Sequence, residues 1–218
     1  MRKYLCNRLG EIANFEIITI AASLGGIGAL DKILSDLPAD FPVPIVIAQH
    51  LYWEVPTQLA TILNRRTKLH VKLAEEGDRL QPSVVYLAPP DHHLLFKSKG
   101  IVGLSLAPRV NFSRPSADVL FESVANFYQA SAIGVILSGK LYDGAAGAQA
   151  IKAQGGRIIT QDYKSSKAFD MPRAAIRTGS VDFVLSLDNI ASALISMVMV
   201  TGISTLLGGS MPISSFTN

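Results

Sequence analysis

The stretch EIITIAASLGG, from Glu16 to Gly26, decides the fold of this 218-residue chain. Its first seven residues form an apolar run rich in isoleucine, which is typical of a parallel strand buried on both faces. The two glycines mark a tight turn, and apolar residues at helical spacing from Ile27 to Leu37 predict a helix behind it. We therefore read the stretch as the strand, turn and helix that open a βαβ unit.

The alternation of strand and helix patterns continues along most of the chain. Further strands are expected at 43–48, 132–137, 157–160 and 183–187, and helices at 55–65, 116–130, 145–153 and 171–177. Short strand patterns without room for crossover helices suggest an antiparallel insertion, and they lie at 69–74, 84–88, 94–97 and 101–106. The sequence thus predicts an α/β fold, a doubly wound three-layer α/β/α sandwich with a mainly parallel sheet and an antiparallel insertion.

Composition limits the class of protein. A hydrophobic share of 49% with 17% charged residues excludes intrinsic disorder. The net charge of +3 is spread along the chain, which falls short of the basic stripe of a nucleic-acid-binding protein. The single cysteine, Cys6, cannot form an internal disulfide, so we expect a cytoplasmic protein.

The two ends of the chain are expected to lie outside one central domain. Charges at Arg8 and Glu11 leave no apolar run of signal-peptide length. The uncharged run after Asp188 is diluted by polar residues, so a buried terminal helix is favoured over a membrane span, which needs about 20 predominantly apolar residues. We expect an N-terminal segment at 1–15, a domain at 16–200 and a C-terminal tail at 201–218.

Three reactive side chains follow strands of the predicted sheet, at the edge where doubly wound folds bind ligands. Ser23 lies on the first turn, a relative of the nucleophile elbow, His50 follows the second strand, and Asp143 follows the strand at 132–137. If these strands are neighbours, the three side chains converge as in a hydrolytic triad. Each also has a structural reading, as helix cap, core histidine and turn residue, and spacing alone leaves both readings open.

Several short motifs occur together in one order. They are ITIAASLGG at 18–26, QH at 49–50, EEGD at 75–78, YLAP at 86–89, RPS at 114–116, GVILSG at 134–139, DGAAG at 143–147 and MPR at 171–173. With these motifs the chain resembles, from about Ile17 to about Met197, the catalytic domain of the CheB-type chemotaxis methylesterases. The resemblance implies Ser23, His50 and Asp143 as catalytic residues without metal or cofactor, and oxyanion or substrate contacts from Leu24, Gly25, Gly26 and Lys140.

The activity that this resemblance implies is hydrolysis of glutamate γ-methyl esters, and deamidation of glutamine, by a serine hydrolase. The implied substrates are cytoplasmic helices of methyl-accepting chemotaxis receptors. The receiver domain that gates such enzymes has no counterpart in the sequence. We therefore expect either a free-standing esterase domain or one regulated by a separate receiver or another chemotaxis signalling protein, and no nucleic acid as partner.

Four positions depart from the family pattern. Ala21 replaces a glycine, and Leu24 replaces a residue that is commonly small or threonine. Lys140 stands where a methionine is usual, and Leu141 replaces a glycine. A positive φ at Leu141 would cost about 1 to 2 kcal/mol. These departures keep an alternative open, namely a catalytically impaired CheB-like binding or scaffold protein in a signalling complex.

Other readings are disfavoured. An α/β-hydrolase would need its acid before its histidine, but every histidine after His50 lies in the expected insertion. A dinucleotide-binding loop would need glycine where Asp31 stands. The adjacent His92 and His93 lack a second pair of ligands, so no metal site is expected. Arg114 and Arg173 have two readings, as contacts for anions or as ties between loops. Residues 164–167 are expected to form a solvated loop.

Overall fold

The computed structural model describes residues 14–51 and 57–200. Its centre is a seven-stranded sheet of order β3-β4-β2-β1-β7-β8-β9, in which every neighbouring pair is parallel. The strands are β1 (Ile17–Ala22), β2 (Ile45–Gln49), β3 (His70–Leu73), β4 (Val84–Leu87), β7 (Ala132–Ile136), β8 (Arg157–Gln161) and β9 (Phe183–Leu185). A separate antiparallel pair consists of β5 (His93–Ser98) and β6 (Ile101–Ser105).

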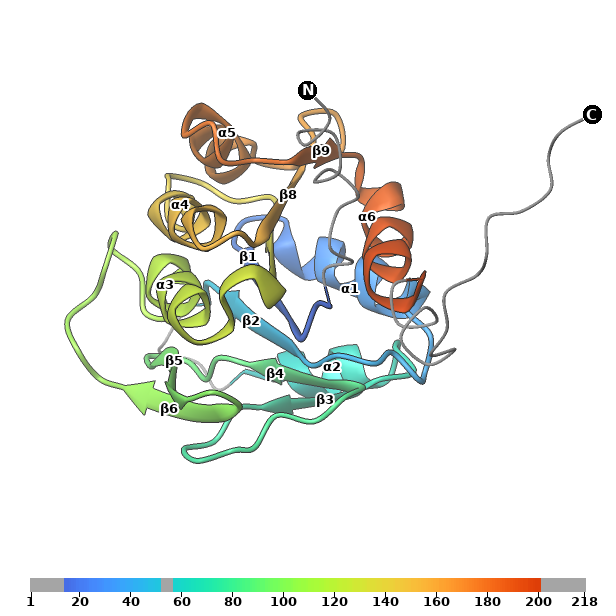
Figure 1. The fold of residues 1–218 in the computed structure, drawn as a ribbon, viewed down its shortest axis with the longest axis vertical. Coiled ribbons are helices and arrows are strands. Elements are labelled where there is room, and N and C mark those ends of the chain that lie inside the picture. The colour runs from blue at the N-terminus through green and yellow to red at the C-terminus, as the bar shows by residue number, and fades with distance from the viewer. Residues whose placement is uncertain (1–13, 52–56, 201–218) are drawn as a thin grey trace, which may run out of the picture.

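Helices cover both faces of the large sheet, as Figure 1 shows. One face carries α1 (Gly26–Asp36), α2 (Leu59–Asn64) and α6 (Leu187–Ile195). The other carries α3 (Ala117–Tyr128), α4 (Ala145–Ala153) and α5 (Asp170–Arg177). The predicted doubly wound α/β/α sandwich is therefore confirmed.

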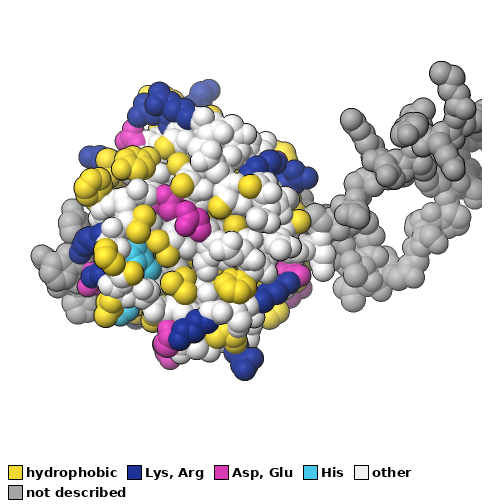
Figure 2. Space-filling model, turned by 60° about the vertical axis from the view of Figure 1, so that its left-hand side comes forward, with side chains coloured by type: hydrophobic (Ala, Val, Ile, Leu, Met, Phe, Trp, Pro, Cys, Tyr) yellow, Lys and Arg dark blue, Asp and Glu magenta, His cyan; other side chains and the backbone are white. Residues whose placement is uncertain are grey.

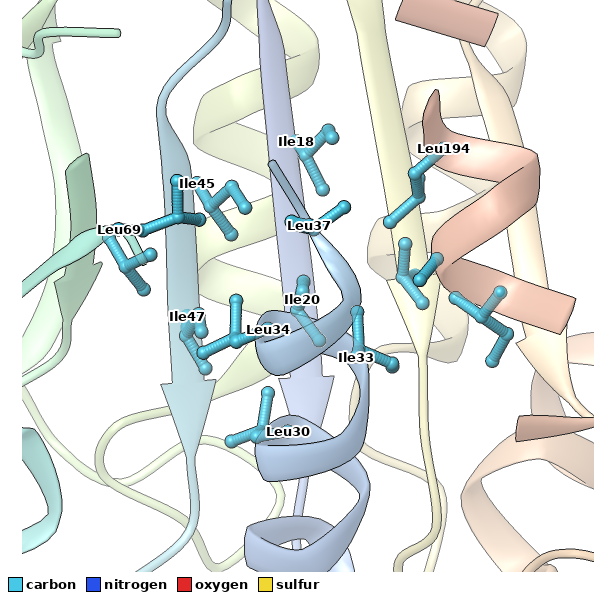
Figure 3. Packing of buried hydrophobic residues seen from close by; sticks show 14 of the residues in the cluster. Ile18, Ile20, Leu30, Ile33, Leu34, Leu37, Ile45, Ile47, Leu69 and Leu194 are labelled. Atoms are coloured by element: carbon cyan, nitrogen blue, oxygen red, sulfur yellow. The ribbon is translucent and has the colours of Figure 1, made fainter. Parts of the chain in front are cut away.

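The opening stretch forms the middle of this sandwich. All six residues of β1 are buried, because helices pack against both of its faces. Ile18 and Ile20 point toward α1, where they meet Ile33 and Leu34 (Figure 3). Each fully buried isoleucine or leucine contributes roughly 1.5 to 3 kcal/mol. The continuous apolar run of β1 is thus the sequence of a central parallel strand.

The prediction of an antiparallel insertion is right for β5 and β6 and wrong for β3 and β4. Those two strands join the main sheet in parallel, although only residues 74–83 connect them. The connection needs no helix, because it pairs with the small sheet: the N–H of Gly77 donates to the carbonyl of Val102 at 3.0 Å, and the N–H of Leu80 donates to Gly100 at 2.9 Å. The hairpin β5-β6 takes the place of the usual crossover helix.

The C-terminal part of the described chain is the buried helix that the sequence favours. Ile190, Ala191 and Leu194 of α6 pack into the core beside α1, and a π-helical turn at 196–200 follows. Within residues 14–51 and 57–200, no helix has the length and apolar character needed to cross a membrane. The tail expected at 201–218 lies outside the described residues, as does most of the segment at 1–15.

Candidate active site

The sheet order brings together the ends of three strands. Strand β1 lies between β2 and β7, with Ala22 beside Gln49 and Ala21 beside Ile136. Ser23 follows β1 directly and His50 follows β2, while Asp143 lies on the turn between β7 and α4. The condition for convergence of the three side chains, that their strands are neighbours, is therefore met.

Ser23 lies on a turn that its surroundings hold in place. Its N–H donates to the carbonyl of Ser138 at 3.0 Å, and its carbonyl accepts from the N–H of Gly26 at 2.9 Å. The cap of α1 is Gly25, with φ of 86°, and not Ser23. A side chain at Gly25 would lie 2.6 Å from Cβ of Lys167, so only glycine fits this crowded, left-handed position. The Ser23 hydroxyl is thus free of the capping role.

His50 and Asp143 form a direct pair. Nε2 of His50 lies 2.8 Å from Oδ2 of Asp143, whose side chain is 1% exposed. An ionised carboxylate only accepts hydrogen bonds, so Nε2 carries the proton and Nδ1 is left as the acceptor. Within the described residues no hydrogen bond joins the Ser23 hydroxyl to His50, although both line one cavity. Such contacts often tighten only when substrate binds.

Asp143 accepts hydrogen bonds from five donors. In addition to His50 they are the Ser116 hydroxyl at 2.8 Å, the Asn111 side-chain amide at 3.1 Å, and the backbone N–H groups of Ala117 and Asp118 at 2.7 and 3.2 Å. Burial opposes ionisation, but the bonds from His50, Ala117 and Ser116 together hold the pKa of this carboxyl below its ordinary value. The carboxylate therefore stays charged beside the imidazole.

Two of those donors, Ala117 and Asp118, belong to the first turn of α3. A second buried carboxylate makes the reciprocal bond, from α3 to α4. Asp118, in the same turn, accepts from the N–H of Gly147 in α4 at 2.7 Å and from Asn111 at 2.6 Å. Burial raises the pKa of the Asp118 carboxyl, and the nearby Asp143 acts in the same direction. Asp143, which precedes α4, thus caps the N-terminus of α3, and Asp118 of α3 caps the N-terminus of α4. These reciprocal bonds fix Asp143 relative to the sheet.

The Ser116 hydroxyl provides a test of this arrangement. It caps α3 by accepting from the N–H of Val119, and it also donates to Asp143. Ser116→Ala should lower the free energy of unfolding by about 1 kcal/mol, the usual cost of a lost cap. The matched control is Ser186→Ala, because Ser186 precedes α6 without any side-chain cap bond. Urea unfolding that shows equal losses for both variants would contradict this role of Ser116.

A cavity of about 670 Å³ lies in front of Ser23 and His50. Its other lining residues are Leu24, Gly25, Ile27, Gly28, Gln49, Leu51, Lys140 and Lys167. Gly139 lies directly against Ser23, because a Cβ added at this glycine would come 2.9 Å from Cβ of the serine. In the described part of the chain the backbone N–H groups of Leu24 and Lys140 have no acceptor. Both can therefore serve a developing oxyanion.

Comparison with known proteins identifies the family. The model of the family described as CheB methylesterase matches residues 18–194, which is most of the chain. The chain belongs to the CheB methylesterase family. It is 44% identical over 184 residues to a putative protein-glutamate methylesterase/protein-glutamine glutaminase of Leptospira interrogans, covering 84% of this chain and 95% of that protein.

Other CheB methylesterases agree with this assignment. Protein-glutamate methylesterase/protein-glutamine glutaminase 4 of Myxococcus xanthus is 41% identical over 83% of this chain, which spans 51% of that protein's length. The crystal structure of the Thermotoga maritima CheB methylesterase catalytic domain superposes with a TM-score of 0.81 at 37% identity, covering 85% of this chain and all of that one. The recognised resemblance and the fold class are both confirmed.

Of the departures from the CheB pattern, Leu24 and Lys140 line the cavity in front of Ser23, and Leu141 does not. Leu141 has φ of 66°, so the expected strain at this position is present, and its side chain is 54% exposed. Leu24 is also exposed at the cavity, whereas Gly26 is buried and its N–H is occupied by Ser23. Of the predicted oxyanion or substrate contacts, Leu24, Gly25 and Lys140 line the cavity and Gly26 lies behind it.

Two residues of the site, Lys167 and Asn111, could not be found from the sequence alone. Lys167, read as part of a solvated loop, lines the cavity, and Asn111 bridges two buried carboxylates from a loop with positive φ at residues 111 and 112. No local pattern marks either residue, because each reaches the site only through the tertiary fold.

Of the two arginines, only Arg114 ties loops together, by binding Asp91 and the carbonyls of Leu106 and Ala107. Arg173 instead pairs with Asp170 within α5. His93 is buried, with Nε2 3.1 Å from the Pro108 carbonyl. Within the described residues no three histidine, cysteine or acidic side chains are grouped to hold a metal ion.

Proposed function

We propose that this protein is a serine hydrolase that removes γ-methyl esters from glutamate side chains of chemotaxis receptors and also deamidates glutamine. The observation that carries the proposal is the His50–Asp143 pair at the end of β2, facing the same cavity as Ser23 in a chain of the CheB methylesterase family. Ser23, His50 and Asp143 are the proposed catalytic residues.

The geometry supports a two-step acyl transfer. Ser23 Oγ attacks the γ-carbonyl carbon while Nδ1 of His50 accepts the hydroxyl proton. The carbonyl oxygen becomes an oxyanion, which the N–H groups of Leu24 and Lys140 and the N-terminus of α1 stabilise. The proton then passes from His50 to the leaving oxygen, the ester C–O bond breaks and methanol departs.

Water completes the cycle. His50 takes a proton from the water as its oxygen attacks the acyl-enzyme, and returns that proton to Ser23 when the ester bond to the serine breaks. Glutamate remains on the substrate, and glutamine follows the same route with ammonia as leaving group. Asp143 keeps its charge throughout, so it stabilises the imidazolium that forms in each step. The residues suffice for this route without a metal or cofactor.

The partners and location are also part of the proposal. The names of the relatives support glutamates and glutamines of proteins as targets. We propose that these lie on cytoplasmic helices of chemotaxis receptors, and hence that the enzyme is cytoplasmic. We propose one esterase domain at 16–200, regulated by a separate receiver or another chemotaxis signalling protein. The alternative of an impaired scaffold rests on Leu24, Lys140 and Leu141, but these leave the His50–Asp143 pair and the cavity in place.

Methanol release from receptors tests this proposal. The full chain, incubated with membranes that carry methyl-labelled chemoreceptors, should release labelled methanol, because its site is arranged to transfer the acyl group to Ser23. His50→Ala protein is the control, since it lacks the base but retains the cavity. Release of methanol by neither protein, together with no labelling by a serine-directed phosphonate, would favour the scaffold.

A further inference from the structure

Two cations line the catalytic cavity, and none of the described residues that line it is a carboxylate. The two cations are Lys140 and Lys167, both exposed. Neither forms an ion pair within the described residues, whereas five other lysines there do, namely Lys32, Lys72, Lys97, Lys99 and Lys152. Among residues 14–51 and 57–200, the charge at the cavity is therefore left without a partner.

The backbone holds both lysines close to the serine. Lys140 follows Gly139, where an added Cβ would lie 2.9 Å from Cβ of Ser23. Cβ of Lys167 lies 2.6 Å from the corresponding point at Gly25, next to Leu24. The two segments are also joined, because the N–H of Gly139 donates to the carbonyl of Ala168 at 2.9 Å. Both side chains thus start from fixed points beside the nucleophile.

The reaction itself does not account for two cations. The reacting ester is neutral, and backbone N–H groups are available for the oxyanion. The same rim is apolar, with Leu24 and Ile27 more than two-fifths exposed. On the side of the molecule that carries α3, α4 and α5, hydrophobic side chains lie among both basic and acidic ones (Figure 2). A complementary segment has a neutral reacting side chain, apolar neighbours and at least one carboxylate.

We propose that Lys140 and Lys167 make the site selective for glutamyl esters and glutamines that have a carboxylate side chain next to the reacting residue. The selectivity arises because the lysine charges attract that carboxylate as the segment enters the cavity. The inference rests on the proposed function and names a substrate feature that the catalytic residues do not determine.

Paired peptides test the selectivity. They carry one glutamate γ-methyl ester and are identical except that the residues beside it are aspartate in one and asparagine in the other, so that neither peptide contains a glutamine that the enzyme could deamidate. The wild-type protein should hydrolyse the acidic peptide with a kcat/KM about tenfold higher at low salt, because each exposed ion pair contributes about 0.2 to 1 kcal/mol. The preference should shrink as salt screens the charges.

The variant for this test is the double substitution Lys140→Gln and Lys167→Gln. It should lose the preference by a rise in KM for the acidic peptide alone. Lys68→Gln is the matched control, because Lys68 is exposed and has no ion pair in the described structure. It precedes β3, so it lies at the amino ends of the strands, whereas the cavity lies at their carboxyl ends. Equal losses on both peptides, or an unchanged preference, would overturn the inference.

Binding separates this inference from the proposed function. Dissociation constants of the two intact peptides are measured with Ser23→Ala protein, with and without the two lysine substitutions. A preference for the acidic peptide that disappears with the lysines supports the selectivity even if neither peptide is cleaved. Cleavage of neither peptide by the wild-type protein would instead count against the proposed function, and equal binding of both would count against the selectivity.

Discussion

Ser23→Ala should lower kcat for methyl-ester hydrolysis by about 10⁶-fold, the effect of removing a serine nucleophile from a hydrolase. The variant should unfold at the same urea concentration as the wild-type protein, because the Ser23 hydroxyl makes no hydrogen bond within the described residues. A large loss of rate with unchanged stability distinguishes a nucleophile from a structural serine.

The measurement pairs methanol release with covalent labelling by a fluorophosphonate. Ser35→Ala is the control, because Ser35 is exposed near the far end of α1 and bonds only the carbonyl of Lys32. It should retain both labelling and activity. Hydrolysis that persists in Ser23→Ala at more than a hundredth of the wild-type rate would place the nucleophile elsewhere.

Asp143→Asn should lower kcat by about 10⁴-fold, as expected when the residue that sets the histidine tautomer is lost. In one orientation the new amide N–H₂ faces Nε2 of His50, which must then give up its proton, so that Nδ1 becomes protonated and cannot act as base. In the other orientation the N–H₂ faces the donors from Asn111 and Ser116. Neither orientation reproduces the carboxylate.

The same substitution should also destabilise the fold, unlike Ser23→Ala. Asp143 caps α3 and is buried, so leaving some of its five donors unpaired should lower the free energy of unfolding by about 2 to 4 kcal/mol. Asp40→Asn is the control, because Asp40 is exposed. Urea unfolding measures both, and a loss for Asp143→Asn no larger than the control's would contradict the capping role.

The pH dependence of that difference follows from the pKa of Asp143. Folding lowers this pKa, so the stabilisation by the carboxylate is fully present above the unfolded value of about 3.9 and is lost as pH falls through the folded value. The stability gap between wild type and Asp143→Asn should therefore be constant from about pH 5 to 8 and narrow below about pH 4. A gap unchanged at pH 3 would show that ionisation of Asp143 contributes nothing.

Much of the architecture could be predicted because buried parallel strands have a local signature. The sequences of β1, β2 and β7 are mostly apolar, and all of their residues are buried. The number, direction and order of these strands in the chain could therefore be predicted. The placement of β3 and β4 was not readable, because the pairing of residues 74–83 with β6 replaces a helix that a local pattern would have marked.

The sequence by itself determined the α/β class, because buried parallel strands are runs of consecutive apolar residues, and its resemblance to the CheB-type methylesterases implied the family and the three proposed catalytic residues. Only the tertiary structure decided how Asp143 is held by α3, how Asn111 joins it to Asp118, and how Lys167 comes to stand beside Gly25. The contacts of Asp143 with Ala117 and Asn111 and of Lys167 with Gly25 join segments more than 25 residues apart. The packing of helices on a sheet, rather than any local periodicity, brings such segments together.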